Sequence, residues 1–189
     1  LTAALFDRDR EVIQLHFGGG TPNFLSPEQL REVVDCLRRH FLFSGSADRD
    51  LSIELDPRFT NPADITELAA IGFNRASLGV QDFDPDVQAA VNRIQSVEET
   101  HAVVDACHGH GFRSVNIDLI YGLPKQHADG FAHTLDTVIR IRPDRVAVYA
   151  SAPLPELFNA PRQPPTPDLP PAPPTPAPPS RPHHTPPPP

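Results

Sequence analysis

The stretch Ser114-Val115-Asn116-Ile117-Asp118-Leu119-Ile120 decides the fold, because it is a run of strand-forming residues with few polar interruptions. Such a run is typical of a strand in a parallel sheet that is covered by helices. Four similar runs, each bounded by turn residues, lie at Val12–Phe17, Leu51–Leu55, Ala76–Val80 and Arg145–Tyr149. Together these runs predict five strands of one parallel sheet.

Helical segments with clear start signals separate the strands. Ser26 precedes Pro27 and Gln29, which predicts an N-cap, a proline at the first helical position and a capping box. Further helices are predicted after Asn61 as far as Gly72, after Asp84, from Ser96 to Gly109 or Gly111, and over Ala128–Ile141. Strand and helix therefore alternate, which predicts an α/β fold that is either doubly wound or barrel-like. In both architectures, functional residues lie at the carboxyl ends of the strands.

Proline is concentrated at the end of the chain, because residues 150–189 hold 18 of the 25 prolines. Few large apolar side chains accompany them, so residues 159–189 are predicted to form a disordered or polyproline II tail. Residues 1–158 are predicted to form one domain. The Pro-x-x-Pro spacings of the tail leave open an alternative function, that of an adaptor for SH3-like partners.

The charge of the chain excludes some classes of partner. A net charge of −8 without a basic run argues against generic binding to nucleic acid or to an anionic membrane. No apolar run is long enough to span a membrane, and no N-terminal signal pattern is present. Cys36 and Cys107 fall in predicted helices, and we expect both to be buried, reduced thiols of a cytoplasmic protein.

A glycine-rich turn, Gly18-Gly19-Gly20-Thr21-Pro22, follows the first predicted strand. Glycine permits positive φ and a close approach of the backbone to a ligand. The turn matches neither the dinucleotide fingerprint nor the phosphate loop, so it does not by itself indicate a bound phosphate. It predicts either a ligand contact of another kind or a strained turn.

Charged and amide side chains follow the next three predicted strands. Glu54 and Asp56 are predicted to share a face, where they could bind a metal, ribose hydroxyls or an ammonium group, or be solvated. Gln81 follows the third strand, and Asp118 lies within the fourth. A carboxylate in an apolar run is costly unless it is paired, so Asp118 is the strongest candidate for a functional charge, with Arg93 as its predicted partner. No zinc-binding spacing and no G-x-S-x-G motif is present.

Five motifs in this order resemble those of the oxygen-independent coproporphyrinogen III oxidases, a family of radical S-adenosylmethionine (SAM) enzymes. They are GGGTP at 18–22, ELDPR at 54–58, GVQDF at 79–83, VNRIQ at 91–95 and NIDLIYGLPKQ at 116–126. The resemblance runs from about Val12 to Phe158. It implies a parallel-sheet partial barrel of the TIM type, a (β/α)6 barrel open at one side, which is incomplete in this chain.

The resemblance also implies cofactors and a reaction. SAM and a 4Fe-4S cluster are expected at the carboxyl ends of the strands, where reductive cleavage of SAM would give a 5′-deoxyadenosyl radical. The radical takes a hydrogen from a propionate of coproporphyrinogen III, and loss of carbon dioxide and one electron leaves a vinyl group. Two such conversions give protoporphyrinogen IX, in heme biosynthesis. A porphyrinogen substrate, an electron donor for the cluster and a monomeric enzyme are implied as well.

The resemblance also implies roles for individual residues of the motifs. Gly19 and Glu54 are expected to contact the SAM that binds at the cluster. The residues expected to contact a second SAM are Gly20, Thr21, Gln81, Arg93, Asp118 and Ala152.

The alternative within this resemblance is a heme-trafficking radical SAM protein that binds heme without oxidase activity. It shares the glycine motif and the Tyr-Gly-Leu-Pro element. The sequences around Asp56, Asp82 and Lys125 are more similar to those of the oxidases.

The chain departs from the family in two ways. The family holds its cluster with a Cys-x-x-x-Cys-x-Cys-type loop upstream of the glycine motif, and neither Cys36 nor Cys107 matches that loop. We therefore expect the chain to be an inactive fragment without a cluster site. The family pattern also decays where the proline excess begins, so the tail is expected to be a corrupted continuation of the domain.

Overall fold

The computed structural model describes residues 9–151 of the chain. The main sheet has five parallel strands in the order of the sequence. They are β2 (Gln14–Phe17), β4 (Asp50–Leu55), β5 (Arg75–Gln81), β6 (Ser114–Tyr121) and β7 (Arg145–Ala150). The predicted parallel α/β fold is confirmed. The unbroken sequential order is that of a barrel wall, whereas a doubly wound sheet reverses its strand order.

The first predicted strand is divided in two. Strand β1 (Glu11–Val12) pairs with β3 (Leu42–Phe43) in a separate two-stranded sheet, whereas β2 pairs with β4. The chain changes partner at Ile13, whose carbonyl accepts a hydrogen bond from the Asp50 N–H at 2.9 Å. One continuous strand over Val12–Phe17 was therefore a wrong prediction, because periodicity does not reveal a change of partner.

Five α-helices and two short 3-10 helices connect the strands of the described region. They are η2 (Pro22–Phe24), α1 (Pro27–His40), η3 (Pro57–Phe59), α2 (Pro62–Ile71), α3 (Pro85–Ala90), α4 (Val97–Gly109) and α5 (Ala128–Ile141). The predicted capping box is present, since the Ser26 side chain accepts from the Gln29 N–H and the Gln29 side chain accepts from the Ser26 N–H. Helix α5 has the bounds that the sequence predicted.

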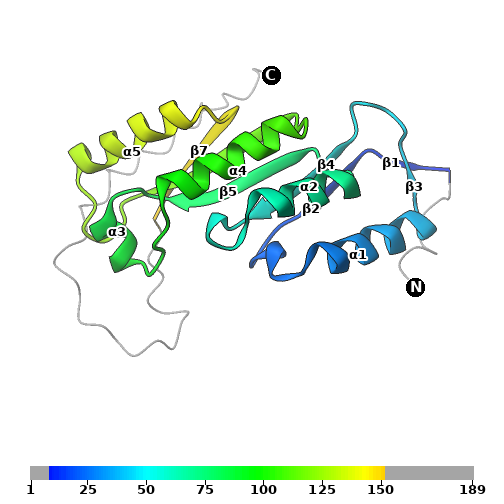
Figure 1. The fold of residues 1–189 in the computed structure, drawn as a ribbon, viewed down its shortest axis with the longest axis horizontal. Helices are drawn as coiled ribbons and strands as arrows, with labels where there is room; N and C mark the ends of the chain where they lie inside the picture. The colour runs from blue at the N-terminus through cyan, green and yellow to red at the C-terminus, as the bar shows by residue number, and fades with distance from the viewer. Residues whose placement is uncertain (1–8, 152–189) are drawn as a thin grey trace, which may run out of the picture.

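The helices cover one face of the main sheet and leave the other open. They lie in front of the strands in Figure 1. Along β5, Ala76, Leu78 and Val80 are buried, while the alternate residues Ser77 and Gly79 are only partly buried. Strands β4 and β6 alternate in the same way. The apolar core therefore lies between the sheet and the helices, and the polar residues of the strands lie on the open face.

The two cysteines lie in different surroundings. Cys107 in α4 is fully buried, as predicted, whereas Cys36 in α1 is exposed. The prediction that both are buried is therefore wrong for Cys36, because its position on α1 lies away from the buried stripe of Leu30 and Val34.

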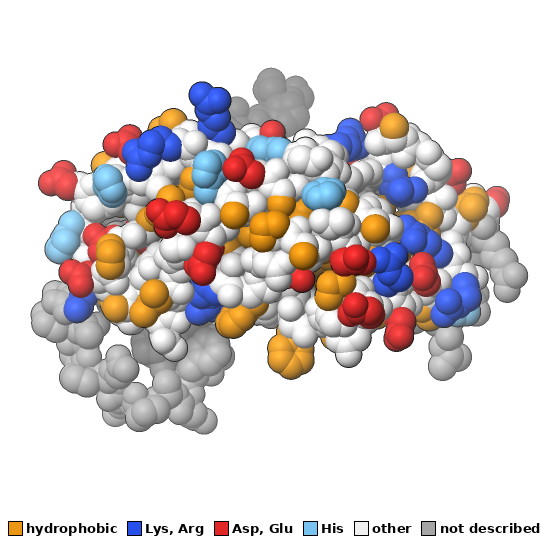
Figure 2. Space-filling view, in the orientation of Figure 1, with side chains coloured by type: hydrophobic (Ala, Val, Ile, Leu, Met, Phe, Trp, Pro, Cys, Tyr) orange, Lys and Arg blue, Asp and Glu red, His pale blue; other side chains and the backbone are white. Residues whose placement is uncertain are grey.

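The helix-covered side carries acidic and basic side chains intermixed, with histidines among them, as Figure 2 shows. Within residues 9–151, no helix is long and apolar enough to cross a membrane. The predicted domain end at residue 158 and the predicted tail over 159–189 lie outside the described residues.

Candidate ligand site on the open face of the sheet

A hollow of about 280 Å³ lies on the open face and extends across all five strands of the main sheet. Its polar lining comes from alternate strand residues: His16, Ser52, Glu54, Arg75, Ser77, Ser114, Asn116, Asp118, Arg145 and Tyr149. Two of the predicted site residues, Glu54 and Asp118, are therefore in one hollow. The apolar residues between them on the same strands point into the core.

The glycine turn is bonded to Glu54. The Gly19 N–H donates to Glu54 Oε2 at 2.9 Å, and His16 Nε2 lies 3.3 Å from Glu54 Oε1. Gly19 and Gly20 have φ of 76° and 58°, which glycine adopts without strain. At Gly18 a Cβ would lie 2.3 Å from His16 Nε2 and 2.9 Å from Glu54 Oε1, so a side chain there would displace both. The conformation of the glycine turn and the position of the Glu54 side chain therefore depend on each other.

Asp118 is held by neutral donors. Ser77 Oγ donates to its Oδ2 at 2.6 Å, and Asn116 Nδ2 donates to its Oδ1 at 2.8 Å. The predicted pairing with Arg93 is therefore wrong. Asp118 faces the open side and is half-buried, so its side chain does not need a cationic partner.

Arg93 instead pairs with Asp56. Its Nη2 donates to Asp56 Oδ2 at 3.0 Å and to the Gly79 carbonyl at 2.9 Å, and Arg58 Nη2 lies 2.7 Å from the same Asp56 oxygen. Burial raises the pKa of Asp56, but hydrogen bonds from Arg58 and the charges of both arginines outweigh it and hold the pKa below its usual value. The carboxylates Glu54 and Asp56, predicted to share a face, therefore take different partners.

Three of the predicted residues gather around Gly79. Asp118 is the register partner of Gly79 in the neighbouring strand. A Cβ on Gly79 would lie 3.1 Å from Gln81 Nε2 and 3.4 Å from Arg93 Nη2. The register shifts between Gly79 and Gln81, and Gln81 adopts a φ of 71°, which turns the end of β5. The structure thus brings Gln81, Arg93 and Asp118 together.

A buried carboxylate next to Gln81 ties the strand ends to each other. Asp82 is 1% exposed and accepts hydrogen bonds from Thr134 Oγ1, Gln126 Nε2 and the Asp84 N–H. Gln126 Oε1 in turn accepts from the Gly122 N–H after β6. We call this set the Asp82 network. It fixes the loops after β5 and β6, which flank the residues around Gly79.

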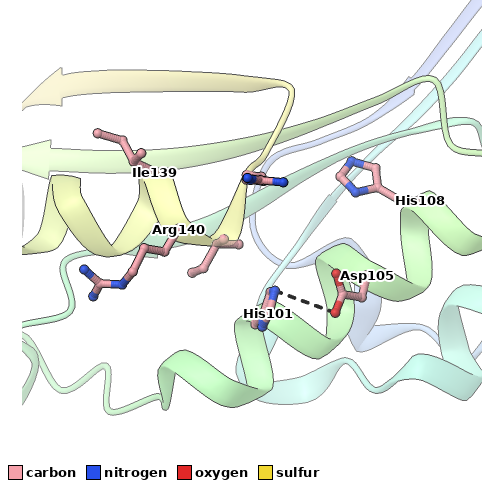
Figure 3. A pocket seen from close by; sticks show the side chains of 7 residues that line it. His101, Asp105, His108, Ile139 and Arg140 are labelled. Carbon is pink, nitrogen blue, oxygen red and sulfur yellow. Dashed lines mark ion pairs between the residues drawn. The ribbon is translucent and has the colours of Figure 1, made fainter.

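A second groove of about 580 Å³ lies between α4 and α5 (Figure 3). Its charged groups are largely paired with each other or with near neighbours: His101 lies 3.6 Å from Asp105, and His108 lies 3.1 Å from Asp144. The groove belongs to the helical layer and not to the carboxyl ends of the strands, so we do not assign it a ligand.

The residues of this chain do not fit a 4Fe-4S cluster. Cys36 is exposed on α1, and burial raises the pKa of the Cys107 thiol in α4 to about 12, so that it is protonated at neutral pH. No group of three or more potential metal ligands occurs among residues 9–151. The residues do fit SAM, because the hollow offers carboxylates for ammonium and hydroxyl groups, and Arg93 offers a guanidinium for a carboxylate.

The remaining predicted contacts are Thr21 and Ala152, and two contributors were missed. Thr21 is exposed and precedes η2, and Ala152 lies outside the described residues. The sequence-based prediction missed Ser77, which bonds Asp118, and the role of Asp56 as the partner of Arg93. The sequence does carry a signal for Ser77: it is a hydroxyl residue two positions before Gly79, and residues two apart in a strand lie on the same face.

Comparison with known proteins identifies the family. The model of the radical SAM superfamily matches residues 2–138. The oxygen-independent coproporphyrinogen III oxidase of Pseudomonas aeruginosa is 53% identical over 82% of this chain and 34% of its own length. The enzyme of the same name from Escherichia coli is 47% identical over 82% of this chain and 33% of its own length. The chain thus spans about a third of the length of these relatives.

Solved structures agree with this result. The coproporphyrinogen III oxidase of Escherichia coli, described as a radical SAM enzyme, matches 90% of this chain and 38% of its own with a TM-score of 0.83 and 46% identity. A radical SAM methyltransferase from Kitasatospora setae matches 73% of this chain and 27% of its own at a TM-score of 0.60 and 17% identity, which shows a shared fold alone. The relatives and the structure that are 46% to 53% identical carry the name of the oxidase and not that of the heme-trafficking alternative. The chain belongs to the radical SAM superfamily.

Proposed function

We propose that this chain is part of an oxygen-independent coproporphyrinogen III oxidase, an oxidoreductase of heme biosynthesis. The observation that carries the proposal is the set of residues at the strand ends, together with the 53% identity to the Pseudomonas aeruginosa oxidase. Glu54 bonds the glycine turn, and Gln81, Arg93 and Asp118 gather around Gly79, which supports their assignment as SAM contacts by the family motifs.

The reaction converts two propionate side chains of coproporphyrinogen III to vinyl groups. Each propionate loses a hydrogen atom from its β-carbon, one electron and its carboxyl group as carbon dioxide. When bound, SAM would supply the radical that takes the hydrogen, and a 4Fe-4S cluster would supply the electron for its cleavage. The cluster needs cysteine ligands other than Cys36 and Cys107. An electron donor, a monomeric enzyme and a cytoplasmic location belong to the same proposal.

This chain's own residues bind and orient SAM. Gly19 and Glu54 take the amino acid end or the ribose of one SAM, because glycine exposes backbone polar groups and a carboxylate accepts from ammonium or hydroxyl donors. The contacts to a second SAM come from Gly20, Thr21, Gln81, Arg93, Asp118 and Ala152. Among them, Arg93 suits a carboxylate and Asp118 suits a hydroxyl or ammonium group.

A chimera tests the oxidase assignment. Residues 9–151 of this chain replace the matching segment of the Pseudomonas aeruginosa enzyme, which supplies the remaining two thirds of the length. After anaerobic reconstitution of the cluster, we expect the chimera to form protoporphyrinogen, measured as protoporphyrin after oxidation. A chimera carrying Asp118→Ala is the matched control, and we expect its product formation to fall at least about tenfold, since a charged hydrogen-bonding contact is lost.

The outcomes separate the two candidate functions. A chimera with an intact cluster that forms no product would contradict the oxidase assignment. Stoichiometric heme binding by that inactive chimera would support the heme-trafficking alternative instead.

A further inference from the structure

Asp56 bonds two guanidinium groups at the carboxyl end of β4. Its Oδ2 accepts from Arg58 Nη2 at 2.7 Å and from Arg93 Nη2 at 3.0 Å, and its Oδ1 accepts from the Arg58 N–H at 3.1 Å. The Asp56 residue is only 6% exposed. We call these three residues the Asp56 cluster. Nothing in the family resemblance gives Asp56 a role toward SAM.

The Asp56 cluster joins three loops of the described region. The Asp56 N–H donates to Asn23 Oδ1 at 3.2 Å, and Asn23 Nδ2 donates back to the Asp56 carbonyl at 3.2 Å. Asn23 lies in η2, directly after the glycine turn. Arg58 Nη1 donates to the Asn92 carbonyl at 3.2 Å, beside Arg93. Asp56 is therefore fixed from both sides, and a displacement of its carboxylate would move Arg93.

The charges of the Asp56 cluster do not cancel. Two guanidinium groups face one carboxylate, so the Asp56 cluster by itself carries one net positive charge. Burial lowers the pKa of Arg93, with the charge of Arg58 acting in the same direction and Asp56 opposing them. Arg93 Nε is buried without a hydrogen-bond partner in the described part of the chain. A partly buried guanidinium with an unused donor and uncancelled charge favours an anionic ligand.

We propose that Asp56 is a positioning residue that orients Arg93 toward the carboxylate of SAM. The inference rests on the proposed SAM site. Arg93 is also held by the Gly79 carbonyl, and Gly79 is the register partner of Asp118, which lines the hollow. Asp56 does not touch the ligand. It fixes the rotamer of Arg93 and leaves the other N–H donors of the Arg93 guanidinium available to the ligand.

A pair of ligands separates positioning from a merely structural role. The full chain is titrated by calorimetry with SAM and with decarboxylated SAM, which keeps the adenosine, sulfonium and amino groups. We expect the wild type to prefer SAM by about 10-fold to 100-fold, because a charge-assisted pair contributes on that scale. Arg93→Ala should abolish this preference. Asp56→Asn should reduce it to about threefold or less, while affinity for decarboxylated SAM changes little.

Asp144→Asn is the matched control. Asp144 also accepts a backbone hydrogen bond, from Val115 at 2.7 Å, but it lies at the opposite end of the strands. We expect this variant to lose stability and to keep the wild-type preference for SAM.

The possible results bear differently on the two proposals. If the wild type binds neither ligand, the SAM site and this inference are both wrong. If the wild type prefers SAM and Asp56→Asn lowers the affinity for both ligands equally, only the positioning role of Asp56 is wrong. If Asp56→Asn does not fold, as judged by circular dichroism, Asp56→Glu replaces it. That variant keeps the carboxylate charge but moves it by one methylene. Its preference for SAM over decarboxylated SAM should therefore lie between those of the wild type and Arg93→Ala. A preference equal to that of the wild type would overturn the positioning role.

Discussion

Successive residues of β5 lie on opposite faces of the main sheet, and the two faces differ in what surrounds them. Leu78 is fully buried beneath the helices, whereas its neighbour Ser77 bonds Asp118 in the hollow. The covered face consists of apolar contacts that are not directional. The open face consists of hydrogen bonds whose geometry is specific. One strand therefore supplies stability on one side and recognition on the other.

The largest effect is expected on the covered face. Leu78→Ala removes a fully buried side chain and leaves a cavity, which should lower the free energy of unfolding by about 3 kcal/mol. Urea denaturation followed by circular dichroism measures it. A loss below about 1 kcal/mol would mean that the helical layer collapses into the space, and that the covered face is less tightly packed than its burial indicates.

The next effect depends on pH and concerns Cys107, also on the covered side. Burial raises its pKa from 9.0 to about 12, so the unfolded chain loses the thiol proton at lower pH than the folded one. The stability from the protonated thiol is complete below pH 9 and decreases as the pH rises toward 12, by about 1.4 kcal/mol per pH unit. Urea midpoints from pH 8 to 10 should therefore fall more steeply in the wild type than in Cys107→Ala.

Cys36→Ala is the control for this measurement, since Cys36 is exposed. Equal slopes for the wild type and Cys107→Ala would show that the thiol of Cys107 is accessible to water, and would weaken the contrast between the two faces.

On the open face, Gly18→Ala should act on ligand binding more than on folding. The added Cβ meets the partly exposed side chains of His16 and Glu54, which can move, so the loss in folding free energy should stay near 1 kcal/mol. The movement breaks the contact between Glu54 and the Gly19 N–H. We expect the affinity for SAM, measured by calorimetry, to fall about tenfold, which is about 1.4 kcal/mol. Unchanged affinity would separate the glycine turn from the ligand site.

The smallest effect is expected for Ser77→Ala, the neighbour of Leu78. Asp118 keeps its bond from Asn116 and is only half-buried, so the folding free energy should fall by less than about 1 kcal/mol. The affinity for SAM should fall by about threefold. If Ser77→Ala destabilised the chain as strongly as Leu78→Ala, the division between a stabilising face and a recognising face would be wrong.

The sequence predicted the covered face better than the open one. Apolar periodicity placed four of the five main strands within one residue and predicted the bounds of α5, because burial of apolar side chains leaves a local pattern. The partners of Arg93 and Asp118 were not predictable in this way. Arg93 is 37 residues from Asp56, and its orientation depends on the Gly79 carbonyl, a backbone group that no residue type reveals. The change of partner at Ile13 has no local pattern either.

The Asp82 network also bears on the order in which the chain folds. Its hydrogen bonds from Gln126 and Thr134 span 44 and 52 residues, so they can form only after β6 and α5 have reached the sheet. Closing loops of that length costs chain entropy before the contacts compensate for it. During synthesis, the end of β5 must wait for the following fifty residues to emerge from the ribosome before Gln81 and its neighbours reach their final positions.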